Sequence, residues 1–135
     1  RPGQDLLDEI SRICRENDYQ AALILTCVGS LTQARLRLAG RSETTVYSGY
    51  FEIVSLAGTI APDGAHLHLS ISDSNGKTWG GHLMPGCRIY TTAEIVLGEL
   101  EGICFSRPLD DETGYDELEI TPLDPADSHP VSGFS

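Results

Sequence analysis

Most of this chain alternates short stretches of apolar and β-branched residues with clusters of turn-forming residues, which is typical of a sheet. The pattern runs from residue 21 to residue 107. The segment at 21–28 (AALILTCV) is continuously apolar, which predicts a strand buried on both faces, and Gly29 and Ser30 after it predict a turn. We expect strands at residues 21–28, 31–38, 45–60, 66–72, 77–83, 87–97 and 103–107.

One helix is predicted before the strands, over residues 4–17. Its apolar side chains recur at helical spacing and form one face: Leu6, Leu7, Ile10, Ile13 and Cys14. A helix that is apolar on one side packs on a sheet, which predicts an α+β class: a twisted, mostly antiparallel sheet with one or two packed helices. At 135 residues the chain has the size of one domain, which we expect at 1–119, followed by an acidic, proline-containing tail at 120–135.

The charge balance argues against two kinds of partner. The chain carries 20 acids and 9 bases, a net charge of −11, whereas a nucleic-acid backbone is bound by clustered Lys and Arg. Residues 99–127 hold ten of the acids and a single base, Arg107. No apolar run approaches the ~20 residues that a membrane span needs. We therefore expect no membrane partner and no direct nucleic-acid binding by this chain alone.

The four cysteines are widely spaced and include no CxxC pair: Cys14, Cys27, Cys87 and Cys104. Three of them sit in apolar contexts, which predicts free, mostly buried thiols in a reducing compartment and so a cytoplasmic location. Disulfides, or a metal role for one thiol, are the alternatives.

Three of the four histidines lie within residues 66–82, and the fourth, His129, is in the tail. His66 and His68 are two apart, so on a strand they project from the same face. His82 follows a predicted turn at 73–77 and would return on the neighbouring strand. Three neutral imidazoles at one point suit zinc, and also iron, nickel or copper, with one coordination position open. The alternative is a polar patch in a crevice, satisfied by hydrogen bonds.

An open metal site that does chemistry needs a nearby acid or base. Glu52 and Glu94 are the candidates, because both are acids within otherwise apolar strands. An acid in that setting either supports a metal ligand, pairs with a base, or lies on an exposed strand face. The sequence does not name a catalytic residue, and whether the chain is an enzyme stays open.

Small and hydroxyl-bearing residues near the histidines are candidates for a ligand crevice. Gly80 and Gly81 precede His82 and would leave room for a small ligand, although tight strand packing explains them equally well. Thr91 and Thr92 offer hydroxyls, although paired threonines are also ordinary strand formers.

The sequence resembles the plants-and-prokaryotes-conserved (PPC) domain family, in its bacterial and archaeal type without an AT-hook. The matching segments are RPGQDLLDEI at the start, CVGSL, GYFEIVSLAGTI, HLHLSISDSNG, GGHLMPGCRIYTTAEIVLGEL and TGYDEL. The resemblance implies the α+β fold, a homotrimer, and a metal bound by His66, His68 and His82. It also links the Phe51-Glu52 segment to partner binding. DNA binding in the family goes mainly with the AT-hook, a basic core that this sequence lacks.

Two functions therefore compete. The first is a homotrimeric domain that binds a transition metal, zinc in the first instance, near a crevice for a small molecule. The second is a non-enzymatic regulatory or interaction module that binds a protein partner.

Overall fold

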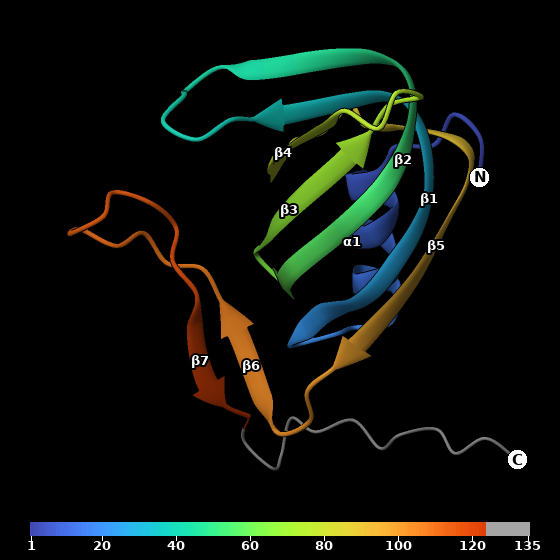
Figure 1. The fold of residues 1–135 in the computed structure, drawn as a ribbon. Coiled ribbons are helices and arrows are strands. Elements are labelled where there is room, and N and C mark those ends of the chain that lie inside the picture. Colours follow the sequence, from blue (N-terminus) through green and yellow to red (C-terminus); the bar gives the residue numbers. More distant parts are fainter. Residues whose placement is uncertain (124–135) are drawn as a thin grey trace, which may run out of the picture.

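The computed structural model describes residues 1–123 as a curved antiparallel sheet that wraps around one helix (Figure 1). The α+β class predicted from the sequence is confirmed. Among the described residues no helix has the length and apolar character needed to cross a membrane. The elements are α1 (Leu6–Glu16), β1 (Ala22–Arg37), β2 (Thr44–Ala61), β3 (Gly64–Ser72), β4 (Thr78–Leu83), β5 (Arg88–Glu99), β6 (Ile103–Ser106) and β7 (Glu119–Pro122).

The main sheet has the strand order β2-β3-β4-β1-β5, and β1 also pairs with β2. The strands β1, β2, β3 and β4 therefore close a ring of neighbouring pairs, each of them antiparallel. The closing contact is short: Leu36 of β1 pairs with Leu83 of β4, and Arg37 pairs with His82. This closure places an arginine directly beside one of the three predicted metal ligands.

The predicted turn at Gly29 and Ser30 is wrong, because β1 runs unbroken through both residues. The strand is paired on both sides there: Gly29 faces Ala93 of β5 and Ser30 faces Glu52 of β2. The turn residues are absorbed as a register shift between β1 and β5. The 21–28 run is also not buried on both faces, since Leu25 is 61% exposed and Val28 is 56% exposed.

Helix α1 packs its apolar face into the concave side of the sheet, with Leu6, Ile10 and Cys14 buried. Its N-terminus is fixed by Asp5, whose Oδ1 accepts hydrogen bonds from the first-turn backbone. The second carboxylate oxygen accepts one from the backbone N–H of Gly86, at 2.6 Å. One buried aspartate thus caps the helix and ties it to the connection between β4 and β5.

After β5 the chain forms a separate two-stranded pair, β6 with β7. The pair stands beside the main sheet, and the segment between its strands projects outward (Figure 1). We call residues 107–118 the arm. The expected domain boundary after residue 119 stays a prediction, and it falls within β7. The rest of the expected tail, including His129, lies outside the described residues.

Candidate metal centre

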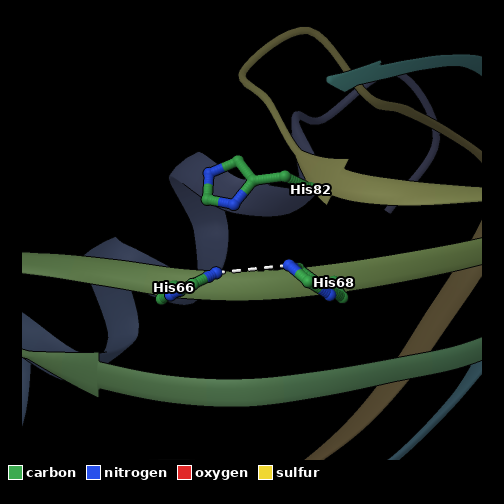
Figure 2. Close-up of side chains that lie close together, drawn as sticks. All are labelled: His66, His68 and His82. Carbon is green, nitrogen blue, oxygen red and sulfur yellow. Dashed lines mark hydrogen bonds between the residues drawn. The ribbon is translucent and has the colours of Figure 1, made fainter. Parts of the chain in front are cut away.

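The three predicted histidines come together on β3 and β4. His68 lies directly opposite His82 across the two strands, and His66 is two residues along β3 on the same face. Figure 2 shows the three rings gathered at one point, with one nitrogen of the His82 ring turned toward the other two rings. One nitrogen from each ring lies within 4.8 Å of the others.

Two features of these rings fit a bound metal. The Nε2 atoms of His66 and His68 are 3.2 Å apart (Figure 2). Two nitrogens bound at 2.0–2.1 Å to one tetrahedral zinc ion would lie about 3.3 Å apart. The Nδ1 atom of His82 is buried and has no hydrogen-bond partner within the described chain, and a buried polar atom without a partner is unusual in a folded protein. The donor set is therefore one that could hold an ion, with one tetrahedral position left for another ligand.

The electrostatics keep the His66 and His82 rings in the form that binds metals. Burial, and then the positive charge of Arg37, lower the pKa of His82 to about 4. Burial and Arg107 also lower the pKa of His66. Both imidazoles are therefore neutral near pH 7, and a neutral ring offers a lone pair.

Two arginines border the histidines. The Nη2 atom of Arg107 lies 3.2 Å from Nδ1 of His66 and donates to the backbone carbonyl of Asp116 at 2.8 Å. Arg37 stands over the ring of Tyr115, its guanidinium carbon 5.9 Å from the ring centroid. Neither arginine is predicted at the site from the sequence alone. The only signal was that Arg107 is the single base in a long acidic segment.

The two predicted acids do not join the histidines in this chain. Glu52 pairs with Ser72 at the far end of β3. Glu94 lies on β5 and pairs with Val28 of β1, away from the histidine strands β3 and β4. Both side chains are exposed. Two acids of the arm do border the histidines, Asp116 and Glu117, and the charge of Glu117 acts to raise the pKa of His66. Glu52 and Glu94 stay predictions that would need a neighbouring subunit.

Of the other predicted site residues, some lie beside the histidines and others do not. Gly80 and Gly81 line the same open hollow as the three histidines. A methyl group on Gly81 would lie 2.8 Å from the carbonyl oxygen of Arg37, so close strand packing also requires this glycine. Thr91 instead shares a hydrogen bond with Ser30, with 2.9 Å between the hydroxyl oxygens. Thr92, the other predicted crevice hydroxyl, is exposed on β5.

Phe51 is buried and points inward, with its ring edge-on to Trp79 at a centroid distance of 6.1 Å. Only Glu52 of the predicted Phe51-Glu52 partner segment is therefore presented to solvent.

One helix inside a curved antiparallel sheet, with three histidines gathered on two neighbouring strands, defines a small α+β domain with a candidate metal centre. Residues 1–101 match the model of the family described as the Plants and Prokaryotes Conserved (PCC) domain. The chain belongs to this family, which confirms the resemblance drawn from the sequence.

Similar proteins agree with this assignment. The chain is 52% identical over 122 residues to "Bifunctional protein GlmU" from Synechococcus sp. (strain JA-2-3B'a(2-13)). That match covers 90% of this chain but 19% of the relative, so the chain spans about a fifth of the relative's length. A hypothetical protein from Salmonella enterica is 46% identical, with a TM-score of 0.87 over 90% of this chain and 88% of that one. The PPC protein of Pyrococcus horikoshii is 27% identical, with a TM-score of 0.73 over 91% and 89%.

Two further solved structures share the fold at lower identity. One, from Archaeoglobus fulgidus, is described as a metal-containing protein and is 24% identical, with a TM-score of 0.74 over 88% of each chain. The other, from Bacteroides thetaiotaomicron, is described as a "putative dna binding protein" and is 19% identical, with a TM-score of 0.75 over 88% and 86%. At these identities the likeness concerns the fold alone.

Proposed function

We propose that this PCC domain binds one divalent transition metal, zinc in the first instance, through His66, His68 and His82. The observation that carries the proposal is the position of the ring nitrogens: two lie 3.2 Å apart, and the third ring has a buried nitrogen without a partner. The Archaeoglobus relative of the same fold is described as metal-containing, which agrees with the proposal.

Three histidines leave one tetrahedral position open, as in catalytic rather than structural zinc sites. Zinc in such a site lowers the pKa of a bound water toward ~7 and makes hydroxide available. The chain's own contribution would be to hold three imidazoles together and to place Glu117 on the arm beside them. We propose no reaction, because a carboxylate near a metal also serves binding alone.

We also propose that the chain associates with copies of itself, as a trimer. Exposed apolar side chains lie on three adjacent strands of the sheet: Leu25, Val28, Tyr50, Val54, Tyr90 and Val96. Burying such a face against another copy removes apolar surface from water, which stabilises association. Light scattering at micromolar concentration tests this, and a monomer would contradict it.

Metal analysis of tag-free protein tests the metal proposal. We expect about one zinc per chain in the native protein and a loss to well below half in His68→Ala and His82→Ala. The matched control is His129→Ala, which removes the fourth histidine and should leave the metal content unchanged. A native protein with far less than one equivalent, unaltered by His68→Ala, would refute the metal site.

A second candidate is a regulatory or interaction module. It is favoured by the curated relatives, in which a similar segment forms about a fifth of a much longer protein. The exposed apolar face would then bind another protein segment rather than a copy of itself. A mutation in that face, such as Val54→Asp, would abolish partner capture while leaving the metal content intact.

We do not propose DNA binding. The structures with that description are 19% and 21% identical to this chain. A net charge of −11 opposes contact with phosphates. A DNA affinity that rises steeply as salt is lowered would reverse this view.

A further inference from the structure

Arginines gather beside the histidine cluster although the chain as a whole is acidic. The whole chain has 9 bases against 20 acids. Two of those bases, Arg37 and Arg107, line one hollow of about 360 Å³ together with His66 and His82. A third, Arg41, lines the adjoining hollow over the same histidines. Three arginine side chains thus lie around the histidine cluster of an acidic protein.

Within residues 1–123, no carboxylate forms an ion pair with these arginines, and the ion pairs found there are those of Arg12 with Glu9 and Glu16 on α1. Arg107 makes both of its side-chain hydrogen bonds through Nη2, to a carbonyl oxygen and a ring nitrogen. A guanidinium has five N–H donors. Arg107 therefore keeps donors for a further acceptor.

The contact with Arg107 fixes which nitrogen of the neutral His66 ring carries the proton. Because an arginine only donates, the Arg107 contact makes Nδ1 of His66 the acceptor, and the neutral ring then carries its proton on Nε2. That proton lies between the two Nε2 atoms that are 3.2 Å apart. If Nε2 of His66 held a metal, the ring proton would sit on Nδ1, and Arg107 would keep its bond to the Asp116 carbonyl with N–H donors left over for another acceptor.

Two acids also line the hollow, Asp116 and Glu117. The carboxylate of Glu117 accepts a hydrogen bond from Thr113 at 3.0 Å. Arg37 and Arg107 together match the charges of these two acids, so the hollow is near neutral on its own. A divalent ion on the histidines would make it positive by about two charges, which favours an anion.

We propose that the hollow between Arg37 and Arg107 binds a small molecule through an anionic oxygen group, a carboxylate or a phosphate, when the histidines hold a metal. The inference rests on the proposed metal site. Planar guanidinium groups suit both kinds of oxyanion, since each can accept two parallel N–H bonds. A hollow of about 360 Å³ has the size for a small metabolite rather than a polymer.

Calorimetric titration of zinc-loaded, desalted protein tests the proposal, with inorganic phosphate and malonate as separate probes and glycerol as the neutral control. Ionic strength is matched with potassium chloride, because salt screens exposed charges. The variants are Arg37→Gln and Arg107→Gln. The matched control is Arg88→Gln, which removes the same charge from an exposed site on β5. Zinc content is measured for every sample.

We expect phosphate or malonate to bind and glycerol not to bind. Each test variant should weaken binding about tenfold or more, as the loss of a charged hydrogen bond does, while Arg88→Gln stays within about twofold. The stronger of the two probes identifies the natural group. Unchanged anion affinity in both variants, with zinc content intact, overturns the anion site and leaves the metal proposal standing.

A native protein without zinc refutes both proposals, and the metal measurement shows that directly. Should Arg107→Gln itself lose zinc, Arg37→Gln alone decides. Equal loss of affinity in Arg88→Gln and Arg37→Gln would also overturn the proposal, because the effect would then be one of net charge.

Discussion

Replacing Gly58 by alanine tests whether the backbone contact behind His66 sets both stability and the metal centre. Gly58 lies on β2 with φ +139°, a backbone conformation that is essentially restricted to glycine. A Cβ atom there would be 2.0 Å from the carbonyl oxygen of His66 and 3.0 Å from its carbonyl carbon. Since both neighbours are backbone, the two strands must separate by roughly 1 Å to restore even a tight contact.

The cost has two parts. The unfavourable backbone conformation costs about 1–3 kcal/mol, and weakening one or two ladder hydrogen bonds costs about 1 kcal/mol each, or about 2–5 kcal/mol altogether. This loss lowers the urea concentration at the midpoint of unfolding by about 2 M, for the dependence of the unfolding free energy on urea that is typical of a small domain. Because His66 moves with its carbonyl, zinc affinity should fall at the same time.

Gly40→Ala is the matched control. Gly40 also has a positive φ, +69°, but no atom lies within 4 Å of a Cβ built there. It should cost about 1–2 kcal/mol and leave zinc binding unchanged. Urea unfolding of metal-free protein at one protein concentration, followed by zinc titration, measures both effects. A Gly58→Ala protein no less stable than Gly40→Ala would refute the reasoning.

Three further outcomes are expected. Asp5→Ala removes the helix cap and the buried acceptor for the β4–β5 connection, and should cost about 2–3 kcal/mol in urea unfolding. His82 holds its pKa near 4 in the fold against an ordinary 6.5, so between those values the unfolded chain binds the extra proton. Metal-free protein should therefore lose stability as pH falls from 6.5 to 4, by about 1 kcal/mol once partial solvation is allowed for, and His82→Gln should flatten that slope. Burial raises the pKa of Cys27 and Cys87 to about 11, so alkylation at pH 8 followed by peptide mass mapping should label the partly exposed Cys104 first. Equal labelling of all the thiols in folded protein would contradict this burial.

The local patterns of the sequence were enough to predict most of the strands, because period-two alternation depends only on which face a residue presents. They missed β7 (Glu119–Pro122), most of which lies in the segment expected to be a tail. They failed where the strands beside a residue determine its conformation or its burial. Gly29 and Ser30 look like a turn in isolation, yet pairing with both β2 and β5 keeps them in one strand. Leu25 and Val28 look buried because they are apolar, but both are more than half exposed among the described residues.

At the site, too, local patterns predict some residues, and long-range contacts decide the others. His66, His68 and His82 could be predicted together because a short turn joins two adjacent strands and fixes their register. Arg107 meets His66 across 41 positions of sequence, through the way β6 and the arm return to the sheet. No spacing rule covers such a contact, and so the residues that border the histidines could be found only in the fold.

The outer surface of β2 links the two proposed properties of this domain. Its middle carries Tyr50, Glu52 and Val54, and nearer its C-terminal end Ala57 pairs directly with His68. A second copy that covers the apolar middle of β2 would therefore also approach the histidines. This is the physical route by which a strand acid such as Glu52 could serve a neighbouring metal centre, although it lies far from its own. If so, Glu52→Gln should weaken zinc binding only at protein concentrations where the copies associate. A Glu52→Gln effect that is independent of concentration would instead indicate an action within one chain, which the register between β2 and β3 does not allow.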